Sequence, residues 1–336
     1  MNNDHVRNAV RAFAISMVAI TILFLVNNVL IFWFEWPGMF ALFGQWGIPG
    51  FDAPDSAIEG GGLLMAFLQT LGYALAVVLP VLYALKKHGS GFREDADRLS
   101  EVAAFVIRAA FWGVVLVGFV DAVISFLRVE NLLEAVVGEQ LTRDLGRAVY
   151  RGSWVHYPLL AASLIIAWRV RSLGFIWLGF LVVIAEFAIV ITRFVFSYEQ
   201  AFMGDLVRFW YASMFLFASA YALVHEGHVR VDVIYARFEK SQKALVNFWG
   251  SLTLGIPLCW IILTMGMWTK TASLNSPMIG FEISQSGYGL YVKYLMAGFM
   301  IVFAVSMIVQ FCSYMLSSMA DLNDEPGGEE IAAASH

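Results

Sequence analysis

Long apolar runs separated by short polar segments dominate this chain of 336 residues. A run needs about 20 mainly apolar residues to cross a bilayer as a helix. The pattern predicts eight such helices, with the expected ranges 9–34, 63–85, 102–127, 153–168, 173–196, 207–224, 248–268 and 292–316. The fourth and sixth runs are short, and the count becomes seven if the fourth crosses only in part.

Composition supports a membrane protein. Hydrophobic residues make up 60% of the chain and charged residues 14%, against about 45–50% and about 25% in soluble domains. Aromatic residues reach 15%, and aromatic belts at the membrane surface are a natural place for them. The predicted fold class is an all-α polytopic membrane protein, which excludes soluble enzymes, nucleic-acid binders and disordered chains.

The distribution of lysine and arginine predicts the orientation. Twelve of the 21 basic residues fall before or at the start of the first run, or in the second, fourth and sixth connecting segments. The opposite segments hold four, all within 128–152, apart from Lys270 at the edge of a span. Because basic loops stay in the cytoplasm, we expect both termini to be cytoplasmic. The chain would then cross the membrane an even number of times.

Two segments outside the spans have their own patterns. Leucine and valine recur every fourth residue in 128–152, with charged residues between them, which predicts an amphipathic helix on the membrane surface, on a partner or on the chain's own spans. Residues 317–336 are acidic and rich in glycine, alanine and serine, so we expect a disordered cytoplasmic tail.

Four ionisable residues fall inside the expected spans: Arg108, Asp121, Glu186 and Arg193. A charge at the bilayer centre costs about 3 kcal/mol or more. Glu186 is closest to the middle of its helix, and Arg193 follows seven residues later on roughly the same face. Three interpretations stay open for them: a packed polar pair between helices, a contact with a partner subunit, or a proton or ion role.

The most specific local sequence is the string Gly227-His228-Val229-Arg230-Val231-Asp232. Gly227 is placed to end the preceding helix in a left-handed conformation. His228, Arg230 and Asp232 alternate with valines, so an extended stretch would project all three to one side. Asp232 could then cap a short amphipathic helix over 233–245. By spacing alone, the string also fits a capped helix–loop–helix with a solvated basic face.

The string, directly after a span, resembles the small membrane subunit (Q type) of TRAP transporters, the tripartite ATP-independent periplasmic uptake systems. Further matching pieces follow the same order: Arg193-Phe194-Val195-Phe196, Asp205-Leu206-Val207-Arg208-Phe209-Trp210, Ala218–Leu223, and Val292-Lys293-Tyr294 with Gln310. Asp205 stands where glutamate is usual. The resemblance covers about 173–316, and it divides the chain into an N-terminal membrane extension (1–172), a four-helix core (173–316) and the tail (317–336).

The resemblance implies a role without catalysis. A large permease (M type), expected as a separate chain, would carry a small organic solute such as a carboxylate or sulfonate together with sodium. A periplasmic solute receptor would deliver that solute transiently. This chain would scaffold and anchor the permease in lipid, and its interface or structural residues would be Glu186, Arg193, Asp205, Arg208, His228, Arg230 and Asp232.

Two other functions would also suit a polytopic membrane chain. An independent channel or secondary transporter would use Glu186 as its ion-pathway residue, but the last two spans offer few polar side chains to line a route. A membrane enzyme would need a catalytic arrangement, yet no metal-ligand spacing, nucleophile–base pair or phosphate-binding loop is present. We therefore expect no cofactor, no metal and no nucleic-acid partner.

Overall fold

The computed structural model describes residues 4–87, 91–171, 175–198, 202–224, 234–283 and 289–327. Within these ranges 82% of the residues are helical and none is in a strand. Seven described helical stretches are long and apolar enough to cross a membrane: Asp4–Phe34, Gly60–Lys86, Phe92–Val129, Ile176–Val195, Phe202–Leu223, Lys240–Met267 and Lys293–Leu322. The predicted all-α polytopic fold class is confirmed.

The fourth expected span, 153–168, is not among the seven. Its residues are nevertheless helical, in α7 (Ala148–Arg151), a π-helical turn η1 (Gly152–His156) and α8 (Tyr157–Arg169), which follow one another without a gap. The N-terminal part of this stretch holds buried Arg151 and His156 in place of apolar side chains. Polar groups therefore shorten its apolar part.

The chain divides into two compact units. Unit 1 comprises Met1–Ser100, Val229–Trp260 and Ile308–His336, and unit 2 comprises Glu101–His228 and Ile261–Met307. Three helices contribute residues to both units: α4 (Phe92–Val129), α12 (Ile256–Met267) and α14 (Lys293–Leu322).

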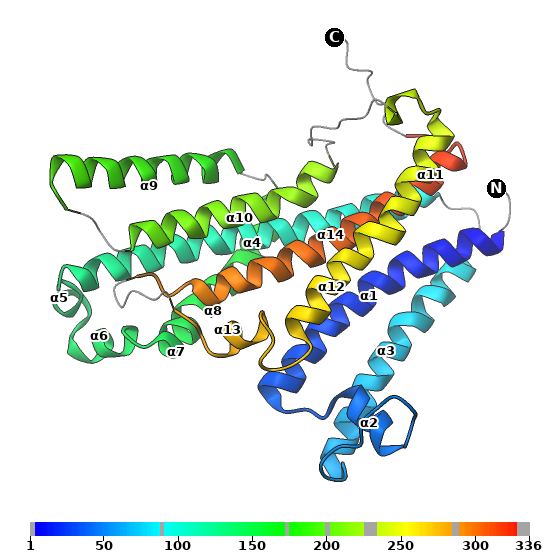
Figure 1. Ribbon diagram of the computed structural model, residues 1–336, viewed down its shortest axis with the longest axis horizontal. Helices are drawn as coiled ribbons and strands as arrows, with labels where there is room; N and C mark the ends of the chain where they lie inside the picture. Colours follow the sequence, from blue (N-terminus) through cyan, green and yellow to red (C-terminus); the bar gives the residue numbers. More distant parts are fainter. Residues whose placement is uncertain are drawn as a thin grey trace. The chain divides into compact units, whose positions relative to one another are not determined.

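In unit 1, helix α1 (Asp4–Phe34) packs along α3 (Gly60–Lys86), and the short α2 (Gly38–Gln45) packs on α3 (Figure 1). The start of α2 is fastened by Gly38, whose N–H donates to Gln69 Oε1 of α3 at 3.0 Å. Gly38 has a φ of +86°, which side-chain-bearing residues rarely adopt. The turn between α1 and α2 therefore depends on a glycine.

A second part of unit 1 is described from residue 234 onward. A 3-10 turn η2 (Tyr235–Arg237) precedes α11 (Lys240–Gly250), which continues through the π-turn η3 (Ser251–Gly255) into α12. The expected helix over 233–245 is thus wrong in its start. A capping box, in which Glu239 and Gln242 exchange side-chain and backbone hydrogen bonds, sets the first turn at Lys240.

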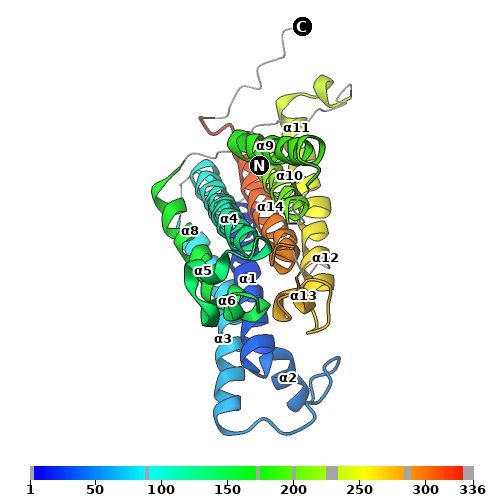
Figure 2. The ribbon, with the colours of Figure 1, turned by 90° about the vertical axis from the view of Figure 1, so that its left-hand side faces the viewer.

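In unit 2, α9 (Phe175–Val195) lies beside α10 (Met203–Val224) (Figures 1 and 2). The expected amphipathic helix over 128–152 is instead broken into α5 (Leu133–Val137), α6 (Glu139–Leu145) and α7. The break falls at Gly138, whose φ is +82°. A helix cannot continue through a left-handed residue, so the fourfold apolar spacing does not make one continuous face. Unit 2 also contains α13 (Asn275–Ile279).

The C-terminal end of α14 lies beyond the expected core boundary at residue 316. The helix continues to Leu322, and Glu325 accepts a hydrogen bond from the Arg93 N–H at 3.1 Å. The expected disordered tail therefore does not begin at residue 317. Residues 328–336 lie outside the described ranges.

Candidate functional site

A cluster of buried ionisable side chains lies in unit 2, near the C-terminal end of α4. Asp121 of α4, Arg151 of α7 and His156 of η1 have no exposed side-chain surface. Asp121 Oδ1 accepts hydrogen bonds from Arg151 Nη1 and His156 Nε2, each at 3.0 Å. A buried charge needs a paired, hydrogen-bonded partner. These contacts explain how an apolar helix carries a carboxylate at this position.

The imidazole of His156 connects the carboxylate to α14. Its Nδ1 lies 2.9 Å from the hydroxyl oxygen of Tyr294, and the two rings stack with centroids 5.9 Å apart. The neutral tautomer with its proton on Nε2 satisfies both contacts, because Tyr294 then donates to Nδ1 and His156 donates to Asp121. In that state the charges of Asp121 and Arg151 cancel within the cluster.

The guanidinium of Arg151 fixes the segment that precedes it. Nε donates to the Leu145 carbonyl at 2.9 Å, and Nη1 also donates to Ser125 Oγ at 3.2 Å. The guanidinium carbon lies 4.0 Å from the ring centroid of Tyr291, within the range of a cation–π interaction. Arg151 therefore joins α4, the α6–α7 segment and the start of α14.

Two carboxylates hold the backbone immediately before α14. Asp121 Oδ2 accepts the Tyr291 N–H at 2.8 Å, and Asp205 Oδ2 of α10 accepts the Leu290 N–H at 3.2 Å. Both backbone donors are buried, since Leu290 is 0% exposed and Tyr291 5% exposed, and buried N–H groups need acceptors. The Tyr291 hydroxyl donates to the Gly146 carbonyl and is contacted by Arg128.

Unit 1 has an ionic cluster of its own. Arg11 Nε of α1 donates to Asp95 Oδ2 of α4 at 2.7 Å, and both side chains are almost fully buried. Lys87 Nζ lies 2.8 Å from Asp95 Oδ1 and 2.8 Å from the Tyr83 hydroxyl. Burial disfavours the ammonium, but the hydrogen bonds to Asp95 and Tyr83 outweigh it and raise the pKa of Lys87. Lys87 is therefore a cation at neutral pH.

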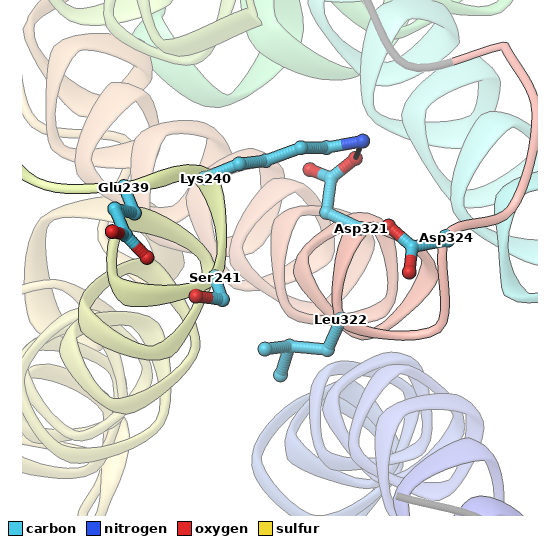
Figure 3. Close-up of a pocket in the computed structure, with 6 residues that line it drawn as sticks. All are labelled: Glu239, Lys240, Ser241, Asp321, Leu322 and Asp324. Atoms are coloured by element: carbon cyan, nitrogen blue, oxygen red, sulfur yellow. Dashed lines mark ion pairs between the residues drawn. The ribbon is translucent and has the colours of Figure 1, made fainter.

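Arg93, near the start of α4, contacts the C-terminal end of α14. It donates to Ser317 Oγ at 2.7 Å and to Asp321 Oδ1 at 2.8 Å. Figure 3 shows a polar pocket beside Asp321, lined by Glu239, Lys240, Ser241, Asp321, Leu322 and Asp324. The Lys240 ammonium lies 3.8 Å from Asp321 and 62% of its side chain is exposed. This pocket therefore opens to solvent, and its ion pair is weak.

The residues predicted from sequence fall into three groups. Asp205 accepts the Leu290 N–H immediately before α14. Arg208 lies 3.5 Å from Asp205, and 75% of the Arg208 side chain is exposed. Glu186 and Arg193 lie on the exposed surface of α9. His228, Arg230 and Asp232 lie outside the described residues.

Sequence reasoning found Asp121 as a charge inside a span but missed its partners. Arg151 is one of the four basic residues in the segment 128–152, and no sequence pattern singles out His156. A buried carboxylate needs a nearby cation or hydrogen-bond donor, so Asp121 itself predicts that such partners exist. The sequence does not say which residue supplies it, since Arg151 is 30 positions away.

The side chains of Asp121, Arg151 and His156 are enclosed, and Asp121 accepts hydrogen bonds from the other two, while Arg151 Nη2 has no hydrogen-bond partner among the described residues. Over the described residues, no group of three or more His, Cys, Asp or Glu side chains could hold a metal ion. Both clusters join helices that precede residue 173 to helix α14.

The fold defines a polytopic helical membrane protein. Residues 181–317 match the family model described as "Tripartite ATP-independent periplasmic transporters, DctQ component". The match covers less than half of the chain, so the similarity to the small component of TRAP transporters is confined to residues 181–317, and the residues before 181 lie outside it. No curated protein and no solved structure matches the chain.

Proposed function

We propose that the chain is the non-catalytic small permease subunit of a sodium-coupled, receptor-dependent uptake system for small organic solutes, such as carboxylates or sulfonates. It scaffolds and anchors the large, substrate-translocating subunit. The observation that carries the proposal is the placement of charge. Asp121 is enclosed in a closed ionic cluster, while Glu186 lies on an exposed helix surface. A translocation route instead needs polar groups from several spans that face one cavity.

The N-terminal extension has a place in this proposal. Its helix α4 is joined through Asp121 to the backbone before α14 and through Arg93 to Ser317 of α14, and α1 is joined to α4 through Arg11. Buried ion pairs hold packed helices in one register. We propose that the extension widens the rigid scaffold that the DctQ region offers to the large subunit.

The proposed function also fixes the membrane, the orientation and the partners of the chain. The chain lies in a bacterial inner membrane, with both termini cytoplasmic and an M-type large permease as a stable partner. A periplasmic solute receptor binds the assembled complex transiently. The unbroken helical stretch from Ala148 to Arg169 supplies the eighth crossing. At about 1.5 Å per residue, its length reaches about 33 Å, enough for a hydrocarbon core of about 30 Å.

The alternative is an independent channel or secondary transporter that uses Glu186. This function needs Glu186 to face other polar groups of the same chain. The structure describes Glu186 as exposed, and no other described residue lies within ion-pair or hydrogen-bond distance of it. The position therefore favours the scaffold function over the pathway function.

Reconstitution in liposomes tests the proposal. The purified chain alone is expected to give no solute uptake under an inward sodium gradient. The large permease with its receptor is expected to give uptake that rises when this chain is included. Sodium-driven uptake by the purified chain alone would overturn the proposal.

The string after α10 provides a second test. Arg230 and Asp232 lie outside the described residues, and we propose that they contact the large permease or order the cytoplasmic loop. Arg230→Ala and Asp232→Ala are expected to reduce the yield of complex or the rate of uptake. Unchanged assembly and uptake in both variants would remove this role.

A further inference from the structure

The outer side of helix α9 combines apolar side chains with one carboxylate. Leu178 and Ala185 are buried on the side that packs on α10. The opposite side exposes Phe180, Val183, Phe187, Val190 and Phe194, each of which is at least 48% exposed. At about 100° per residue, Glu186 projects between these two sides, next to Val183 and Val190.

Glu186 lies near the middle of a membrane-spanning helix, at a depth where lipid provides no polar partner. Helix α9 has 21 residues, so at about 1.5 Å per residue it matches a hydrocarbon core of about 30 Å. Residue 186 is next to the midpoint of Phe175–Val195. Lipid chains at this depth carry no cation and no hydrogen-bond donor. Within the described ranges, no basic group lies within 4.0 Å of the Glu186 carboxylate.

We infer that this side of α9 docks a transmembrane helix of the large permease, and that a lysine or arginine of that helix pairs with Glu186. The inference rests on the proposed function, because it takes the large permease as the stable partner. A basic side chain at the same depth neutralises the carboxylate, and the flanking valines and phenylalanines supply the apolar contact. Inside a membrane, ionisable residues pair with one another in this way.

A second copy of this chain does not meet the same requirement. In a two-fold dimer with both copies in the same orientation, equivalent residues of α9 face one another, so the two Glu186 carboxylates would be opposed. Arg193 of the other copy would lie about 10 Å further along the helix axis. A different chain with a basic residue at mid-membrane depth satisfies the charge instead.

The test co-expresses the full chain with the large permease of its uptake system and recovers the complex through a tag on this chain. Glu186→Arg is expected to lower permease recovery at least tenfold, and Glu186→Gln to lower it less. Ile184→Gln is the matched control, because Ile184 is 47% exposed on the other flank of α9, and it is expected to leave recovery unchanged. Exchanging the partner's basic residue for glutamate is expected to restore recovery with Glu186→Arg.

A photo-crosslinking amino acid supplies the second measurement, which does not depend on altering Glu186. Placed at Val190, it is expected to form an adduct with the permease, and placed at Ile184 it is expected to form none. Elution profiles of the variants expressed alone separate misfolding from lost docking. If Glu186→Arg and Glu186→Gln recover as much permease as the original chain, or the adduct forms only at Ile184, the inference is overturned and the proposed function stands. If the original chain recovers no permease, both fail.

Discussion

Asp121 and Arg151 form an ion pair of 3.0 Å in which neither side chain has any exposed surface. The carboxylate belongs to a long apolar helix, and the guanidinium belongs to a short helix 30 residues later. Both also contact Tyr291: Asp121 accepts a hydrogen bond from the Tyr291 backbone N–H, and Arg151 lies over the Tyr291 ring. The pair therefore joins the N-terminal extension to the DctQ region.

Asp121→Asn is expected to lower the free energy of unfolding by about 3–5 kcal/mol, because it leaves the Arg151 charge buried without a counter-charge. Unfolding of the detergent-solubilised chain measures it. Glu139→Gln is the control, since Glu139 pairs with Arg143 at 3.0 Å while both side chains are more than 60% exposed. A surface pair contributes about 1 kcal/mol or less. Equal losses in the two variants would contradict a special role for the buried pair.

Tyr294→Phe is expected to lower the free energy of unfolding by about 1–3 kcal/mol, because His156 Nδ1 loses the Tyr294 hydroxyl while the stacked ring remains. Tyr211→Phe serves for comparison, since Tyr211 is 54% exposed and surface changes usually stay within about 0.5 kcal/mol. Thermal unfolding in the same detergent measures both. A Tyr294→Phe variant as stable as Tyr211→Phe would show that the hydroxyl contact contributes nothing.

Gly152→Ala is expected to destabilise unit 2 by about 1–3 kcal/mol through overpacking. A Cβ at residue 152 would lie 2.3 Å from the ring of Phe281. Gly250→Ala is the matched change, because a Cβ there meets nothing within 4 Å and alanine is the better helix former by about 1 kcal/mol. The two variants should shift the melting temperature in opposite directions. A shift in the same direction would show that Phe281 moves aside freely.

Deletion of residues 1–172 is expected to yield a chain that aggregates after extraction in detergent. The deletion removes the acceptor of the Tyr291 N–H and the Arg93 partner of Ser317 and Asp321. Size-exclusion chromatography of a fluorescently tagged chain measures this. Restoring residues 91–171 should recover part of the monodisperse peak, because that segment carries Arg93, Asp121 and Arg151. A monodisperse deletion variant would show that the DctQ region is independent of its extension.

Hydrophobic length predicted most of the fold. Seven of the eight expected spans coincide with long apolar helices, because spanning a bilayer leaves little choice of structure. The exception, 153–168, has near its start the buried His156, which contacts Asp121 and Tyr294. Such a contact between distant residues leaves no periodic pattern. Two capping signals also compete before α11. Asp232 was the expected cap, but the capping box at Glu239 sets the start of the helix.

The site was predicted in part. Asp121, Glu186 and Asp205 each stood out as acidic residues in apolar surroundings, but only packing decides whether such a residue is enclosed or exposed. Asp121 is enclosed and Glu186 is exposed, although both lie in strongly apolar helices. Aromatic partners such as Tyr291 were not distinguishable, because the chain has 12 tyrosines with similar neighbours.

The shared anchoring of the Leu290–Tyr291 backbone constrains how this chain can be recombined. One of its two carboxylates, Asp121, comes from the extension, and the other, Asp205, from the DctQ region. A chimaera that takes residues 181–317 from another protein would keep Asp121 and Arg151 but replace the aromatic residues that contact them. Such a graft would need compatible residues at the positions of Tyr291 and Tyr294, so the two halves of the chain are expected to covary at these sites.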